Sequence, residues 1–229
     1  MKRTVVSTCV WAVLAVGGLR ADTVLIQSGP GGNGTQYNTG VNGAVPLGEA
    51  NVVLTPPHPA WAPAIGASQW ISFVDNYSPT PSGQDPCGAG YLICNGDSVS
   101  FFHTFTLTNS ASYSGLLQVM ADDTADVWLN GVQLFAAVAD YTGLYPYSYS
   151  RCADVPIGCQ SDTTGIMGID ASLLHDGTNT LEFTVWQKDG TGYGLDYSMA
   201  LSNVPEPGIF GLISGCLGAL LALRRKSVA

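Results

Sequence analysis

The amino-acid sequence predicts an all-β fold, an antiparallel β-sandwich, for the central part of this 229-residue chain. Gly, Ser, Thr, Asn, Tyr and Val are abundant there, and β-branched and aromatic residues pack well on a pleated sheet. Apolar and polar residues alternate over short runs, and turn residues separate the runs. Several short strands with regular turn signals are typical of a sandwich or jelly roll. The part 22–203 is long enough to bury a core of its own.

The strand pattern is weak before residue 98 and strong after it. Asn130-Gly131 between apolar runs predicts a type I′ hairpin, because both turn positions need a positive φ. A second hairpin is expected around Lys188-Asp189-Gly190, and a helical turn at 171–175. His103, Trp128 and Trp186 are expected to be structural, the tryptophans in the core. The predicted strands are 52–54, 70–74, 99–107, 115–123, the arms of the hairpin 126–135, 165–169, 178–187 and 193–202.

The N-terminal residues 1–21 have the pattern of a signal peptide. Lys2 and Arg3 precede an apolar stretch, and Ala21 offers a small residue for cleavage. A retained anchor helix is the alternative, but Arg20 interrupts the apolar run soon after it reaches the minimal length. We therefore expect an exported protein.

The C-terminal residues 204–229 combine a Pro-Glu-Pro motif, an uncharged stretch at 208–223 and a basic end. The uncharged stretch would form a transmembrane helix of roughly 24 Å, just short of a typical hydrocarbon core. The basic cluster belongs on the cytoplasmic side, so the body would face outwards. The motif residues are Val204, Pro205, Glu206 and Pro207, and the basic residues are Arg224, Arg225 and Lys226.

These three parts, in this order, resemble the PEP-CTERM sorting signal of Gram-negative bacteria. The resemblance implies processing by an exosortase, a membrane cysteine protease or transpeptidase that cuts near the motif. It also implies transient anchoring in the inner membrane, then a place at the cell surface or in the medium of a bacterium that makes extracellular polysaccharide. An ordinary C-terminal anchor after a proline-rich hinge is the alternative.

The central region is similar to galactose-binding-like β-sandwiches. The stretch ADDTADVWLNGVQLF, then LLHDGTNTLEFTVWQ and GLDYSMAL, follows their pattern of an aspartate-rich lead into a hairpin and a later strand. The resemblance covers about half of the body. Such domains include carbohydrate-binding modules and purely structural domains, so the fold alone does not settle function.

The charge distribution excludes some partners. The whole chain has a net charge of −9, but all 17 acidic residues lie between Asp22 and Glu206. Only Arg151 and Lys188 oppose them there, which makes the net charge of this part −15. Such a body repels nucleic acid and anionic lipid headgroups. It suits divalent cations, polar glycans or basic partners, and it also favours simple solubility.

Four cysteines of the body form two pairs of equal spacing, Cys87 with Cys94 and Cys152 with Cys159. Four cysteines allow three connectivities. We predict local disulfides, Cys87–Cys94 and Cys152–Cys159. The loop-closure entropy cost is small for each pair, and cysteines of exported proteins are expected to form disulfides. A zinc site of four thiols is the alternative, but the gaps are wider than in the usual Cys-x2-4-Cys knuckle.

Two groups of residues are candidate binding sites. The first, Asp122, Asp123, Asp126 and Asn130, offers oxygen ligands for Ca²⁺, although the spacing is not that of an EF-hand and turn chemistry is the alternative. The second is a loop of tyrosines whose rings offer flat faces to sugars, with packing on the sandwich edge as the alternative. Its members are Tyr141, Tyr145, Tyr147 and Tyr149.

No enzyme motif is evident in the sequence. It contains neither Gly-x-Ser-x-Gly nor His-Glu-x-x-His, and its three histidines are scattered. We therefore predict a non-enzymatic exported surface or matrix protein that binds carbohydrate, with no cofactor other than Ca²⁺. A secreted hydrolase acting on polysaccharide through paired carboxylates is one alternative. A purely structural or adhesive surface module is the other.

Overall fold

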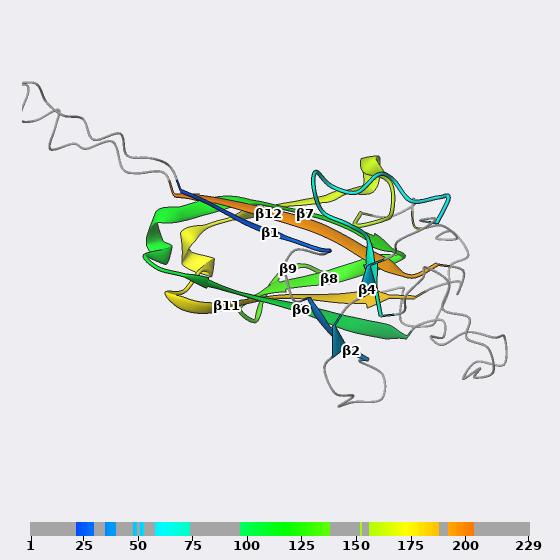
Figure 1. Ribbon diagram of the computed structural model, residues 1–229, viewed down its shortest axis with the longest axis horizontal. Helices are drawn as coiled ribbons and strands as arrows, with labels where there is room; N and C mark the ends of the chain where they lie inside the picture. The colour runs from blue at the N-terminus through cyan, green and yellow to red at the C-terminus, as the bar shows by residue number, and fades with distance from the viewer. Residues whose placement is uncertain are drawn as a thin grey trace, which may run out of the picture. The chain divides into compact units, whose positions relative to one another are not determined.

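The chain folds into two antiparallel β-sheets, as a computed structural model shows (Figure 1). The described residues contain no α-helix. No helix among them is long and apolar enough to cross a membrane. The structure describes residues 22–29, 35–39, 48–49, 51–52, 58–73, 97–137, 152, 156–187 and 192–203. The predicted signal peptide, sorting tail, Cys87–Cys94 disulfide and tyrosine loop lie outside these residues.

Sheet A runs in the order β10-β7-β12-β5-β4, with β1 also paired to β12. Its strands are β1 (Thr23–Gln27), β4 (Asn51–Val52), β5 (Ile71–Ser72), β7 (Tyr113–Asp122), β10 (Gly165–Ile169) and β12 (Gly194–Asn203). β1 and β12 are antiparallel neighbours, so Thr23 lies opposite Ser202. Both ends of the described chain therefore leave the sandwich at the same end, here called the exit end.

Sheet B runs in the order β3-β2-β6-β11-β8-β9. Its strands are β2 (Gln36–Thr39), β3 (Gly48–Glu49), β6 (Ser98–Leu107), β8 (Thr124–Leu129), β9 (Val132–Phe135) and β11 (Gly177–Trp186). Short 3-10 helices connect some of the strands of both sheets. They are η1 (Ser110–Ser112), η3 (Ser161–Thr163) and η4 (Ala171–Leu173).

The predicted Asn-Gly hairpin is confirmed. β8 pairs with β9, and Asn130 and Gly131 between them have φ of 52° and 77°. The side chain of Asn130 also supports the turn, because its Nδ2 donates to the carbonyl oxygen of Leu173 and its Oδ1 accepts from the Thr180 amide. The turn residue thus joins the hairpin to the neighbouring strand.

The predicted hairpin between 178–187 and 193–202 is wrong. The two strands exist, but β11 pairs with β6 and β8 in sheet B, whereas β12 pairs with β7, β1 and β5 in sheet A. The chain therefore crosses from one layer to the other between them. Two adjacent alternating runs predict two strands but not which sheet each strand joins.

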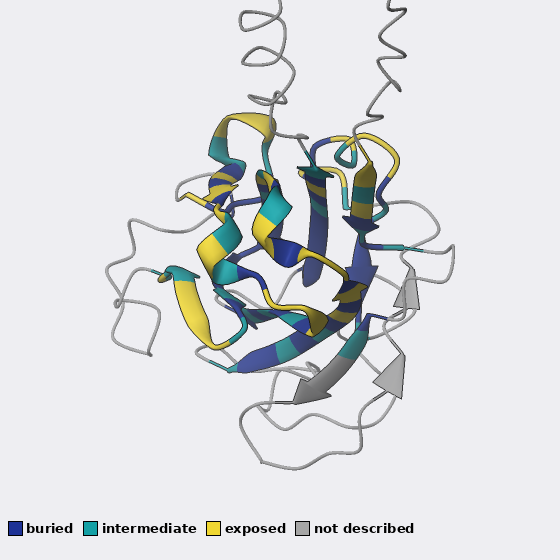
Figure 2. Ribbon diagram, turned by 90° about the vertical axis from the view of Figure 1, so that its left-hand side faces the viewer, coloured by how far each residue is buried: buried dark blue, intermediate teal, exposed yellow. Residues whose placement is uncertain are grey.

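The core lies between the two layers. Along β6 and β11 buried positions alternate with half-buried or exposed ones, as Figure 2 illustrates for the strands it shows. Two tyrosines of the β12 region join the sheets. Tyr193 donates its hydroxyl to the carbonyl oxygen of Val185 at 2.6 Å, and Tyr197 places its ring 4.5 Å from that of Phe183. The all-β sandwich predicted from the sequence is therefore confirmed.

His103 is structural, as predicted. Its side chain is buried on β6, and its Nδ1 lies 2.6 Å from the hydroxyl of Tyr197 on the opposite sheet. Burial lowers the pKa of the His103 imidazole. The Tyr197 hydroxyl also contacts Thr35 Oγ1 at 2.7 Å. These polar groups satisfy one another inside the core, as buried polar groups generally must.

Candidate functional site

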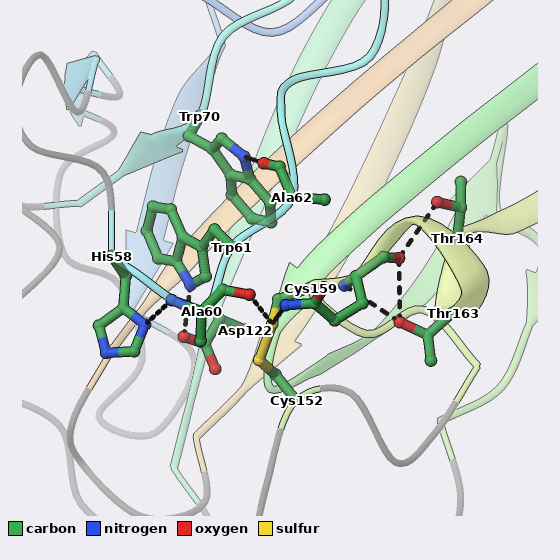
Figure 3. Close-up of a disulfide and its surroundings, with 11 residues drawn as sticks. His58, Ala60, Trp61, Ala62, Trp70, Asp122, Cys152, Cys159, Thr163 and Thr164 are labelled. Carbon is green, nitrogen blue, oxygen red and sulfur yellow. Dashed lines mark hydrogen bonds between the residues drawn. A yellow bond between two sulfur atoms is a disulfide. The ribbon is translucent and has the colours of Figure 1, made fainter.

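The outer face of sheet A is covered at the end of the sandwich away from the chain ends. Here residues 58–73 lie over the sheet, and a second, smaller apolar cluster forms between them and the strands (Figure 3). Trp61 and Trp70 stack with ring centroids 4.3 Å apart and pack with Met120 of β7. A Cβ on Gly194 would lie 2.5 Å from the Trp61 ring, so the glycine makes room for the indole.

The predicted Cys152–Cys159 disulfide is confirmed and belongs to this cover. The Cys159 carbonyl oxygen accepts from the Ala62 amide at 2.8 Å, and the neighbouring Gly158 carbonyl oxygen accepts from the Ala121 amide at 3.1 Å. The disulfide loop is thus hydrogen-bonded both to the covering segment and to β7. Its role in the structure is to fasten the cover to the sheet.

Two carboxylates are buried under this cover, Asp122 and Asp196. Asp122 Oδ2 accepts from Trp61 Nε1 at 2.7 Å. Asp196 accepts from the Ser28 hydroxyl at 2.9 Å and from the Ile65 amide at 2.8 Å. Burial raises the pKa of the Asp196 carboxyl, while its hydrogen bonds oppose this shift. Both groups hold the cover in place.

The residues predicted to bind Ca²⁺ do not form one site. Asp122 is directed to Trp61, whereas Asp126 accepts from Trp186 Nε1 at 2.8 Å and from the Ala137 amide at 2.7 Å. Asp123 is buried, and Asn130 belongs to the hairpin turn. Within the described part of the chain, no group of three or more His, Cys, Asp or Glu side chains is placed to hold a metal ion. The acidic run is used for local structure.

The outer face of sheet B differs, because aromatic and acidic side chains stay partly exposed there. Trp128 and Trp186 were predicted to lie in the core, and this is wrong: both are half-buried on the outward-facing positions of β8 and β11. Their inward-facing neighbours Val127 and Val185 are buried. The residues two positions before these tryptophans, Asp126 and Thr184, are polar, so the large ring itself, and not the alternation of its strand, suggested burial.

One row of side chains crosses this face at right angles to the strands. Phe102 of β6 lies opposite Glu182 of β11, which lies opposite Trp128 of β8, which lies opposite Gln133 of β9. We call Phe102, Glu182, Trp128 and Gln133 the sheet B row. Neighbouring strands are separated by about 4.8 Å, so the two aromatic positions lie roughly 10 Å apart with the carboxylate between them.

The sheet B row offers three kinds of contact. Phe102 and Trp128 present partly exposed rings, Glu182 a half-buried carboxylate, and Gln133 an exposed amide. Desolvation by burial raises the pKa of the Glu182 carboxyl. Such a set can stack on a flat apolar ring and hydrogen-bond to hydroxyl or amine groups at its edge. No nucleophile–base arrangement is part of the row.

Sequence reasoning missed Phe102 and Glu182, although a usable signal existed. In the run LEFTVW, Leu181, Phe183 and Val185 share one phase, while Glu182 and Thr184 mark the other phase as outward-facing. Trp186 belongs to that polar phase. Strand alternation read in this way would have placed Trp186 and Glu182 on one exposed face.

Comparison with known proteins gives no relative from which to assign this face. No protein-family model matches the chain, and no curated protein and no solved structure is similar to it at a significant level.

Proposed function

We propose that this protein is an exported, non-enzymatic surface or matrix protein whose β-sandwich binds carbohydrate on the outer face of sheet B. The observation that carries the proposal is the half-buried Glu182 between the aromatic positions Phe102 and Trp128. Sugar rings have apolar faces that stack on aromatic rings and hydroxyl groups that donate to carboxylates. An open sheet face suits an extended polysaccharide chain.

The delivery part of the proposal rests on the ends of the chain. The signal peptide 1–21 and the PEP-CTERM-like tail 204–229 would bring the protein to an exosortase in the inner membrane, which would release it to the surface or medium. The exit end supports this, because Thr23 and Ser202 are paired neighbours next to both segments.

We further propose that the sandwich is a galactose-binding-like jelly roll. The path of the chain supports this: β6 lies in sheet B, β7 in sheet A, β8 and β9 in sheet B, β10 in sheet A, β11 in sheet B and β12 in sheet A. Repeated crossing between two antiparallel sheets supports a jelly roll over a single-sheet meander.

Binding is tested with the full chain in a detergent that has no sugar headgroup. Immobilised neutral and amine-bearing polysaccharides should retain the protein, and Trp128→Ala should reduce retention at least about fivefold, since stacking on one ring is worth on the order of 1 kcal/mol or more. Leu116→Ala is the matched control, because Leu116 is an exposed apolar residue on sheet A. Equal loss in both variants, or no retention of the unaltered chain by any polysaccharide, contradicts the binding proposal.

Delivery is tested separately by mass spectrometry of the mature protein from a host that carries an exosortase. We expect a new C-terminus near Pro207. Recovery of the intact tail from that host contradicts processing and leaves the binding result unaffected.

A further inference from the structure

Glu182 has no partner among the residues that the structure describes. Its carboxyl is half-buried, and burial alone raises its pKa, with no hydrogen bond or neighbouring charge acting on it. The neighbouring outward-facing carboxylate differs: Asp126 accepts from Trp186 Nε1 and from the Ala137 amide. Asp126 is therefore occupied by the protein itself, and Glu182 is the carboxylate left to a ligand.

The charge around Glu182 favours a cation. None of the described residues is Lys or Arg, and the part of the chain from Asp22 to Glu206 has a net charge of −15. Directly beside Glu182 on its own face lie neutral residues, Thr180 and Thr184 on β11 and Phe102 and Trp128 on the neighbouring strands. The diagonal neighbour Asp126, opposite Thr184, is a second carboxylate. A negatively charged sugar would be repelled, whereas a protonated amine would be attracted.

The aromatic residues, like the carboxylate, favour a positively charged ligand. The face of an aromatic ring attracts a cation through its quadrupole, most strongly for tryptophan. A carboxylate flanked by Phe102 and Trp128 therefore offers an amine a charge-assisted hydrogen bond together with cation–π contacts. A neutral hydroxyl in the same place would still donate a hydrogen bond to the carboxylate, but it would bring neither a second charge nor cation–π contacts.

We propose that the sheet B row selects polysaccharides with free amino groups, the amine of a glucosamine-type sugar binding Glu182 and its ring stacking on Trp128 or Phe102. This inference rests on the proposed carbohydrate-binding function and adds the class of sugar. Gln133, at the end of the row, donates its Nε2 to Asp126 Oδ1 at 3.4 Å, and its Oε1 can accept from a hydroxyl of the same saccharide chain. An extended saccharide matches the row, because its four members lie side by side across four neighbouring strands.

The test uses the full chain in a detergent without a sugar headgroup and measures its affinity for three oligosaccharides. The probes are a β-1,4-linked glucosamine oligomer, its fully N-acetylated form and a uronic acid oligomer of the same length. We expect the amine form to bind about tenfold more tightly than the acetylated form, because acetylation removes the charge that pairs with Glu182 and the cation–π contacts. The uronic acid oligomer should bind most weakly.

Two matched variants separate the row from the general negative charge. Glu182→Gln should bring the ratio of the two affinities close to 1 and change acetylated-oligomer binding less than about threefold. Asp162→Asn also removes one charge from an exposed position, in η3, and should leave the ratio unchanged. Equal losses in both variants would mean that the amine is attracted by net charge alone, which overturns the assignment to Glu182.

The other outcomes are distinguishable. Equal affinity for the amine and acetylated oligomers overturns the amine selectivity and leaves the proposed function standing. No binding of any oligosaccharide overturns both. Polylysine of matched length is included as a further probe, and if it binds more tightly than the glucosamine oligomer with the same dependence on Glu182, the site belongs to a basic polypeptide and the saccharide assignment is wrong.

Discussion

The outer faces of the two sheets use the same residue types in opposite ways. On sheet A, Trp61 and Asp122 are both buried and bonded to each other at 2.7 Å beneath residues 58–73. On sheet B, Trp128 and Glu182 lie on neighbouring strands, are half-buried and have no such bond between them. A tryptophan beside a carboxylate thus stabilises the fold on sheet A, whereas on sheet B the same two residue types stay partly exposed.

The difference shows that residue type alone does not identify a binding site. Burying a carboxylate is costly unless donors satisfy it. On sheet A, Trp61 donates to Asp122, and Ile65 of the covering segment and Ser28, which follows β1, donate to Asp196. On sheet B the described residues supply none to Glu182, so its remaining hydrogen-bonding capacity is available to solvent or to a ligand. The unmet capacity, rather than the acidic character, distinguishes the open face.

The largest expected effect is a loss of stability, which we compare for one tryptophan on each face. Trp61→Ala should lower the free energy of unfolding by about 3–5 kcal/mol, because it removes a buried ring and leaves a cavity against Trp70 and Met120. Trp128→Ala should cost about 1 kcal/mol, since its ring is partly exposed. Urea unfolding followed by circular dichroism measures both. Similar losses in the two variants would remove the distinction between a structural face and an open one.

The next effect concerns the disulfide that fastens the cover. Replacing Cys152 and Cys159 together by Ser should lower the free energy of unfolding by about 2–3 kcal/mol, the loop-closure value for so short a loop. Saccharide binding by sheet B should not change. The same unfolding experiment, repeated with the binding measurement, checks both statements. Loss of binding in this variant would show that the two faces are coupled.

A third comparison exchanges one carboxylate on each face for the amide. Asp122→Asn should destabilise the protein by about 1–3 kcal/mol, because a buried acceptor of the Trp61 indole is replaced by a group that also carries donors. Glu182→Gln should change stability by no more than about 0.5 kcal/mol, because its carboxylate has no partner among the described residues. A large loss in Glu182→Gln would reveal a structural role for that residue.

The smallest effect is a pH dependence from Asp196. Its folded-state pKa is raised above the ordinary 3.8 by burial, so the folded state holds the proton more tightly than the unfolded state. Its contribution is therefore most favourable below 3.8 and declines as pH rises from 3.8 through the folded pKa. Asp196→Asn cannot titrate, so its melting temperature relative to the unaltered protein should rise between about pH 3 and pH 7. Parallel melting curves across that range would contradict the raised pKa.

The sequence predicted the strands better than their partners. Alternation located β6, β10 and β12 to within a residue or two, because one phase of each run is clearly apolar. It paired β11 with β12 wrongly, because sheet membership depends on contacts distant in sequence. It also placed Trp128 and Trp186 in the core because of their large apolar rings, although the residues two positions before them, Asp126 and Thr184, are polar.

The candidate site was predicted less well than the fold. The acidic run around Asp122 predicted a cation site, because consecutive aspartates can bind a cation. The hydrogen-bond partner of Asp122 is instead Trp61, which lies 61 residues earlier in the sequence. Glu182 is a single acidic residue in a strand, and its significance depends on lateral neighbours from β6 and β8. Which residues form a row across a sheet depends on the register between strands, and a single stretch of sequence does not specify that register.

The pairing of β1 with β12 has a consequence for how the chain can be cut and rejoined. Asn203 donates its amide to the Asp22 carbonyl oxygen at 2.8 Å, so the two strand ends are anchored to each other. Trimming residues before Asp22 and after Asn203 would remove none of the strands that the structure describes. A short linker from 203 to 22 would close the backbone into a ring, and a new opening at the Asn130-Gly131 turn should yield a circular permutant with both sheets preserved.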